Sequence, residues 1–248
     1  MMVQTESSTP LLLETRCLSK EFGGVHALDG VNFRLRRGEL RSLIGPNGAG
    51  KSTFFKILSG QLQPSKGDVL FDGKAIVGLP PHRIARLGIG IKNQVPSLWD
   101  GLSVYEHFWL AAYRHTGKRG AMERADRLLQ QLGLWQKASQ SVGTLSHGER
   151  QWVEIGMVMA QEPLLLLLDE PAAGMTEEEV ERTAALLRAI NTEASLIVVE
   201  HDMQFIRMLE GLVTVFYQGR VLMEDTIDAV LADAKVREVY LGTADSHG

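Results

Sequence analysis

The feature that most constrains this sequence is a glycine-rich segment, Gly-Pro-Asn-Gly-Ala-Gly-Lys-Ser-Thr at residues 45–53. It matches the P-loop pattern G-x-x-x-x-G-K-[ST], in which backbone N–H groups surround a triphosphate and glycines permit close approach. Lys51 is expected to reach the β- and γ-phosphates, and the Ser52 hydroxyl is expected to ligate Mg²⁺. The residues predicted to bind the nucleotide here are Gly45, Pro46, Asn47, Gly48, Ala49, Gly50, Lys51, Ser52 and Thr53.

The flanking residues decide whether such a match is meaningful, because a P-loop must follow a strand and begin a helix. Residues 39–44 predict a short strand, and residues 54–60 predict an amphipathic helix that ends at a glycine. A glycine-rich turn with a stray lysine is the alternative, and the presence of both flanking elements argues against it. The sequence therefore predicts binding of a nucleoside triphosphate.

The rest of the chain predicts an α/β fold. Residues 11–18 and 31–35 predict strands before the P-loop, with a turn carrying Phe22 between them. The continuous apolar run at 164–168 is typical of a strand in a parallel sheet covered on both faces, and residues 195–200 predict another buried strand. We expect a P-loop core with a mainly parallel sheet, an N-terminal antiparallel β subdomain and an inserted helical subdomain.

The helical insertion is predicted from the pattern of residues after about position 95. Ser103 begins one helix with the spacing of a capping box, and a second helix spans 122–132 before Gly133. This block separates two α/β portions. We expect one nucleotide-binding domain over residues 11–248, with the helical subdomain at about 95–160.

Three further motifs carry polar side chains to predicted element ends. Asp169 and Glu170 end the apolar run at the carboxyl edge of the sheet, where α/β folds bind ligands. His201 directly follows a strand. Ser146 and Gly148, in Leu-Ser-His-Gly-Glu, precede a helix whose N-terminus favours anions. A solvated acidic pair and an ordinary exposed histidine are the alternatives for these positions.

Composition narrows the class of protein. Of 248 residues, 44% are hydrophobic and 23% charged, which is ordinary for a globular chain with a sizeable core. The net charge of −4 argues against nucleic-acid binding by bulk electrostatics. The single cysteine, Cys17, cannot form an internal disulfide, which is typical of a reducing compartment, and we expect it to be buried. The sequence contains neither a signal-peptide pattern nor an apolar run of about 20 residues.

Motif order and spacing over essentially the whole chain resemble the ATPase subunits of ABC transporters. The resemblance implies that ATP and Mg²⁺ are the cofactors and that Asp169 holds the metal, usually through water. It implies that Glu170 polarises the attacking water, a role that suits a general base beside the γ-phosphate. It also implies that His201 contacts the γ-phosphate.

The same resemblance gives roles to Gln94 and Phe22. Gln94 would touch Mg²⁺ or the attacking water and join the core to the helical block, although an ordinary loop amide is the alternative. Phe22 would stack on adenine, although a core ring at a strand end is the alternative. The catalytic candidates are thus Glu170, His201, Gln94 and Lys51, and the metal candidates are Ser52, Gln94 and Asp169.

The resemblance to ABC-type ATPases also implies that Ser146 and Gly148 complete the ATP site of a second subunit, identical or related. Two chains would then enclose two nucleotides head to tail. This sequence has His147 where glycine is commonest. The usual Ser-Ala-Leu-Asp loop is also altered, since Ala173 has no hydroxyl and Thr176 no carboxylate. These departures put the loop's contacts across the dimer in doubt.

The loop at 172–176 and the terminal Tyr240-Leu-Gly resemble importers of branched-chain amino acids, urea or short amides, and residues 90–94 and 149–156 favour the urea branch. The resemblance implies a location on the cytoplasmic face of a bacterial inner membrane. The implied partners are permease subunits and, indirectly, a solute-binding protein, without nucleic acid. The alternatives are a lipopolysaccharide-export ATPase and a non-transport ABC ATPase of translation or DNA repair. A docking groove is expected near the aromatics Trp99, Tyr105, Phe108 and Trp109, for which internal packing is the alternative.

Overall fold

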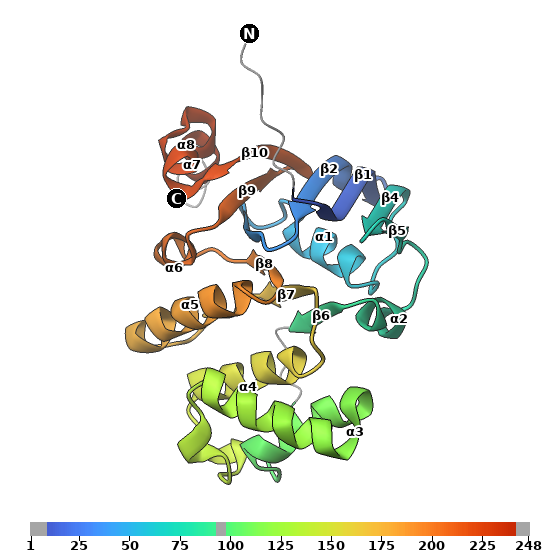
Figure 1. The fold of residues 1–248 in the computed structure, drawn as a ribbon. Coiled ribbons are helices and arrows are strands. Elements are labelled where there is room, and N and C mark those ends of the chain that lie inside the picture. The colour runs from blue at the N-terminus through green and yellow to red at the C-terminus, as the bar shows by residue number, and fades with distance from the viewer. Residues whose placement is uncertain (1–8, 93–97, 242–248) are drawn as a thin grey trace.

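A computed structural model describes residues 9–92 and 98–241 of the chain. It contains an antiparallel sheet in the order β2-β1-β4-β5 and a larger sheet in the order β10-β9-β3-β8-β7-β6 (Figure 1). In the larger sheet only β10 runs antiparallel to its neighbour. The strands are β1 (Leu11–Phe22), β2 (Val25–Arg36), β3 (Leu40–Ile44), β4 (Lys66–Phe71), β5 (Lys74–Ala75), β6 (Ile89–Lys92), β7 (Leu165–Asp169), β8 (Ser195–Val199), β9 (Leu212–Tyr217) and β10 (Arg220–Thr226). The predicted α/β fold class is confirmed.

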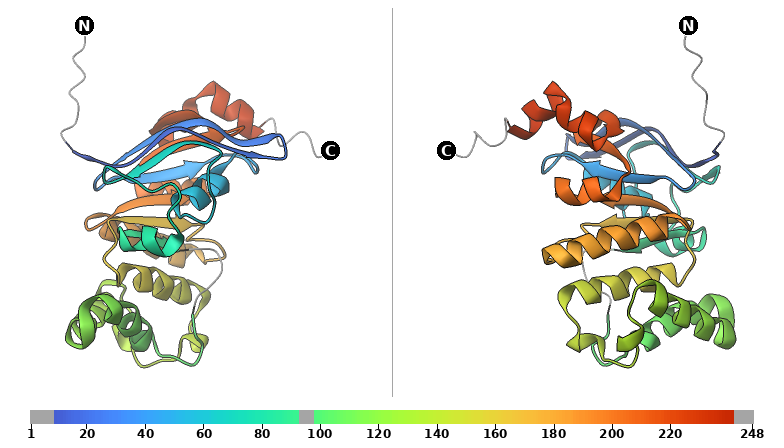
Figure 2. Two further views of the ribbon diagram at one scale, coloured as in Figure 1. Left: turned by 90° about the vertical axis from the view of Figure 1, so that its right-hand side faces the viewer. Right: turned by 60° about the vertical axis from the view of Figure 1, so that its left-hand side comes forward.

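Helices cover both faces of the larger sheet. They are α1 (Lys51–Leu58), α2 (Pro81–Arg86), α3 (Val104–Gln131), α4 (His147–Met159), α5 (Glu177–Asn191), α6 (Met203–Leu209), α7 (Ile227–Ala232) and α8 (Ala234–Leu241), with short 3₁₀ turns η1 (Trp135–Lys137) and η2 (Val142–Thr144). Figure 2 shows α3 and α4 on the side of this sheet away from α1 and the antiparallel sheet. The described residues contain no helix that is both long and apolar enough to cross a membrane.

Buried strands alternate between two apolar clusters. In β7, Leu165 and Leu167 pack with α1 and the antiparallel sheet, whereas Leu166 and Leu168 pack with α4 and α5. All four side chains are fully buried. The ring of Phe54, on α1, lies 5.3 Å from Phe33 of one sheet and 5.3 Å from Phe216 of the other. The helix that follows the P-loop is therefore fixed between the two sheets.

The helical insertion between β6 and β7 begins as predicted. The Ser103 side chain accepts a hydrogen bond from the Glu106 backbone N–H, and the Glu106 carboxylate accepts one from the Ser103 N–H. Gly117 has φ 67° and interrupts α3, so the two predicted helices appear as two parts of one element. Capping thus gives α3 its start, and a glycine conformation gives it its break.

The N-terminal sheet differs from prediction at two points. The predicted turn at residues 19–24 is wrong up to Phe22, because β1 continues and pairs Phe22 with Val25. Cys17 is exposed, so its predicted burial is wrong as well. A bulge between Arg16 and Ser19 shifts the register, with Cys17 at φ 46° and its N–H donating to Asn32 Oδ1 at 2.9 Å. The bulge breaks the two-residue alternation on which burial in a strand depends.

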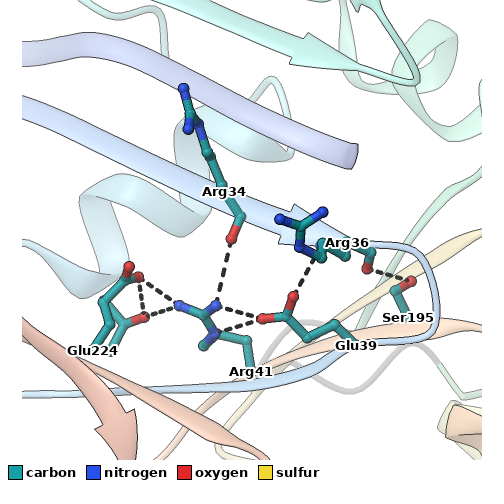
Figure 3. Close-up of polar contacts among 7 residues, drawn as sticks. Arg34, Arg36, Glu39, Arg41, Ser195 and Glu224 are labelled. Atoms are coloured by element: carbon teal, nitrogen blue, oxygen red, sulfur yellow. Dashed lines mark hydrogen bonds and ion pairs between the residues drawn. The ribbon is translucent and has the colours of Figure 1, made fainter. Parts of the chain in front are cut away.

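An ion cluster joins β3, the strand that precedes the P-loop, to β9 and β10. The Arg41 guanidinium, on β3, contacts the carboxylates of Glu39 and of Glu224 on β10 (Figure 3). It also donates to Thr214 Oγ1 on β9 at 2.8 Å. The Arg41 side chain is 6% exposed, so solvent screens this cluster little.

We expect Arg41→Met to lower the free energy of unfolding by about 3 kcal/mol, because two partly buried carboxylates lose their cation. Denaturant titration measures this change. Arg119→Met is the matched control: it removes the exposed Arg119–Glu123 pair of α3 and should leave the midpoint unchanged. Equal midpoints for both variants would contradict a stabilising role for the Arg41 cluster.

Candidate functional site

The P-loop turns sharply between β3 and α1, and only glycine fits its two ends. At Gly45, with φ 148°, an added Cβ would lie 2.2 Å from the Phe216 carbonyl oxygen. At Gly50, with φ 109°, it would lie 2.6 Å from the Ala27 oxygen. The loop is therefore packed closely between β2 and β9, which fixes its backbone N–H groups.

A cavity of about 330 Å³ lies over this loop. It is lined by Phe22, Ala27, Asn47, Gly48, Ala49, Gly50, Lys51, Ser52, Thr53, Asp169, Glu170 and Val199. The fold thus brings together the predicted P-loop, the predicted acidic pair and Phe22 from distant parts of the chain. Gly45 and Pro46 begin the loop, and their carbonyl oxygens accept hydrogen bonds from Lys51 Nζ at 2.5 and 3.1 Å.

The charged groups of the cavity influence one another. Burial lowers the pKa of Lys51, while Glu170 and Asp169 oppose this effect. Burial also raises the pKa of Asp169, and the neighbouring Glu170 raises it further. Two acids crowded in a half-buried position make this a favourable environment for additional positive charge.

Glu170 is held in an unusual backbone conformation at the end of β7. Its φ is 48°, and its N–H donates to the Val199 carbonyl at 2.9 Å. His201 Nδ1 lies 3.6 Å from Glu170 Oε1, with 71% of the histidine side chain exposed. The structure therefore places His201 beside Glu170, whereas the cavity wall itself is formed by other residues. Non-glycine residues at positive φ are uncommon and cluster at functional sites.

The other predicted residues lie in different surroundings. Gln94 falls outside the described residues. Phe22, at the end of β1, lines the cavity and is 49% exposed, so it is not a core ring. Lys20 Nζ lies 4.9 Å from the centroid of its ring. Ser146 and Gly148 lie at the start of α4, across the larger sheet from α1 (Figure 2). The structure does not bring these two into the cavity.

Sequence reasoning missed a buried acid next to the site. Glu200 is 3% exposed, and its carboxylate accepts backbone hydrogen bonds from His201 at 3.0 Å and from Ala172 at 3.3 Å. Burial raises the pKa of Glu200. It links the loop after Glu170 to the segment that carries His201. A charged residue ending the buried run 195–200 was the available signal.

The fold and the cavity define a P-loop nucleotide-binding protein, and comparisons with known proteins specify it. A model of the ABC transporter family matches residues 28–173. The chain is 34% identical to the high-affinity branched-chain amino acid transport ATP-binding protein BraF of Pseudomonas aeruginosa, over 94% of this chain and 98% of BraF.

Solved structures agree. MJ1267, an ATP-binding cassette of an ABC transporter, superposes with a TM-score of 0.85 at 27% identity, over 94% of this chain and 99% of that one. A dimeric post-hydrolysis structure of the cassette MJ0796, bound to ADP and Pi, gives 0.75 at 26% identity, over 87% and 99%. The chain belongs to the ABC transporter family. It is an ATP-binding subunit with ATPase activity.

Proposed function

We propose that this chain is the ATP-hydrolysing subunit of an importer for branched-chain amino acids. The observation that carries the proposal is the match to BraF, which extends over almost the full length of both proteins. Urea or a short amide is the second candidate cargo, favoured by the sequences of residues 90–94 and 149–156. The cargo site belongs to other subunits, so these residues bear on the cargo only through family likeness.

The cavity supports a division of roles among its residues. The P-loop amides and Lys51 bind the phosphates, while Phe22 stacks on adenine at the open end. Glu170 takes a proton from the attacking water. His201, whose Nδ1 lies 3.6 Å from Glu170 Oε1, contacts the γ-phosphate. Hydrolysis by this arrangement depends on positioning and on stabilising charge that develops on the phosphate.

The same cavity suits Mg²⁺, because the Ser52 hydroxyl and the Asp169 carboxylate both line it. Among the described residues no three His, Cys, Asp or Glu side chains gather as a metal cluster. Mg²⁺ needs only one or two protein oxygens when phosphates and water complete its shell. Ser52 and Asp169 would hold the ion, together with Gln94 from the segment that is not described. When bound, it would neutralise charge on the phosphates.

We propose that two such subunits, identical or related, enclose two nucleotides. Ser146 and Gly148 lie away from their own cavity, as residues serving a partner's nucleotide must. The dimeric MJ0796 structure shows that a cassette of this fold can pair. Thr176 begins α5 as its N-cap, with the Glu179 side chain completing the capping box. Its hydroxyl accepts the Glu179 N–H and so caps the helix at the position where the usual loop has a carboxylate.

The helical insertion is the proposed link to a permease. We treat residues 11–248 as one nucleotide-binding domain and about 95–160 as its helical part. Trp99 is 59% exposed and stacks on the buried His107, with centroids 5.9 Å apart, whereas Phe108 is fully buried. Phe108 is therefore a core residue, in agreement with the alternative of internal packing. Trp99, with the half-buried Tyr105 and Trp109, remains for docking.

Affinity purification of the chain from native membranes in mild detergent tests this function. We expect multi-span permease subunits and an ABC ATPase partner to copurify with the chain. The proposed location of the chain is the cytoplasmic face of a bacterial inner membrane. A solute-binding protein would join through the permease. Recovery with ribosomes or nucleic acid and no permease would contradict the proposal and favour a role in translation or DNA repair. Copurification with lipopolysaccharide-export proteins would support the ATPase function and contradict the assignment to an importer.

A further inference from the structure

The start of α4 and the start of α5 are joined by one carboxylate. Ser146 Oγ donates to Glu179 Oε1 at 2.9 Å, although the two residues are 33 positions apart. The Glu179 carboxylate also packs closely against Gly148, whose backbone N–H helps to lower its pKa. The other carboxylate oxygen accepts the Thr176 N–H at 3.0 Å. Glu179 therefore binds the Ser146 hydroxyl and lies against Gly148, the two residues that the proposed sandwich requires for a partner's γ-phosphate.

The Glu179 side chain leaves no room for a side chain at Gly148. A Cβ at Gly148 would lie 2.5 Å from both Cδ and Oε1 of Glu179. Hydrogen bonds from Thr176 and Ser146 hold the pKa of Glu179 below its usual value, although partial burial opposes them. The side chain is thus an anion at neutral pH, bound where the helix dipole favours negative charge.

A second contact joins the loop at residues 172–176 to the start of α4. His147 Nε2 lies 3.1 Å from the Ala173 carbonyl oxygen. The Ala173 N–H in turn donates to the Glu170 carbonyl oxygen at 3.3 Å. Residues 170–179 therefore connect the proposed general base to the Glu179 carboxylate on α5, which contacts the start of α4.

We propose that Glu179 is a positioning residue that occupies the phosphate-binding end of α4 until the γ-phosphate of the partner's ATP displaces it. The inference rests on the proposed head-to-tail sandwich. A serine hydroxyl has one proton to donate, so Ser146 cannot serve both anions at once. Displacement would release the loop that begins at Glu170 and so report the partner's nucleotide to this subunit's own reaction centre.

ATP-dependent dimerisation tests this exchange. The Glu170→Gln subunit, mixed with the second ATPase of its transporter where the two differ, is titrated with Mg-ATP and followed by sedimentation velocity. Adding Glu179→Gln removes the competing charge, and the midpoint for dimerisation should fall about tenfold in ATP concentration. Glu178→Gln in the same background is the matched control, since it removes an exposed charge from the same helical turn.

ATP affinity of the dilute single subunit should be the same in all three proteins. A midpoint for Glu179→Gln that equals the Glu178→Gln control, or lies higher, would overturn the proposal, because a merely structural cap weakens the dimer when it is lost. If the Glu170→Gln subunit itself stays monomeric in ATP, the sandwich is wrong and the exchange at Glu179 is overturned with it. The two failures are therefore distinguishable.

Discussion

Glu170→Gln will lower the rate of ATP hydrolysis by about a thousandfold, because the attacking water loses the group that takes its proton. Binding of ATP should remain, since glutamine has nearly the same size and the P-loop contacts are unchanged. The geometric basis is the position of Glu170 in the cavity wall, one residue after Asp169. Phosphate release measured beside binding of a fluorescent ATP analogue separates the two effects.

Glu177→Gln is the matched control for this experiment, because it removes a carboxylate from the exposed first turn of α5. Its hydrolysis rate should equal that of the unaltered protein. Turnover by Glu170→Gln within a few fold of normal would remove Glu170 from the role of general base and leave the water to another group.

Lys51→Ala will instead weaken nucleotide binding, raising the ATP dissociation constant about 100-fold. A charge-assisted hydrogen bond to a phosphate contributes about 3 kcal/mol, and alanine supplies neither its charge nor its donor. The Lys51 ammonium donates to the loop carbonyls of Gly45 and Pro46, and Lys51 itself lines the cavity. Isothermal titration with ATP and with adenosine measures the effect and shows whether it is confined to the phosphates.

Lys56→Ala provides the comparison, since Lys56 is exposed on the same helix and outside the cavity lining. Its ATP affinity should change less than about twofold, as for a screened surface charge. If Lys51→Ala binds ATP as tightly as Lys56→Ala does, the cavity over the P-loop is not where the triphosphate binds.

The sequence alone was sufficient to predict those features for which the residue types permit only one local structure. The P-loop requires glycine at Gly45 and Gly50, whose added Cβ atoms would meet backbone oxygens. Continuous apolar residues in β7 could only be buried on both sides. Capping boxes at Ser103 and Ser146 set two helix starts through residues three positions apart. The capping boxes follow from contacts between residues three positions apart, and the P-loop and the apolar strand follow from residue patterns, so these features were predictable.

The features that were missed depend on tertiary contacts. The Ser146–Glu179 bond joins two helices whose packing no sequence pattern specifies. Glu200 looks like the polar end of a strand, yet its burial beneath two backbone N–H groups appears only in the fold. At Cys17 a bulge exposes a small residue of the first strand that we expected to be buried. Long-range pairing and register lie beyond what periodicity can indicate.

We propose that ATP hydrolysis by this chain drives import of branched-chain amino acids. The most direct test reconstitutes the complex recovered from native membranes in lipid vesicles, with its solute-binding protein, and measures hydrolysis together with uptake of labelled solute. Leucine, isoleucine or valine should stimulate hydrolysis and be taken up, and Glu170→Gln should abolish both. Stimulation and uptake with urea alone would contradict the assigned cargo, and solute-independent hydrolysis without uptake would contradict the transport function itself.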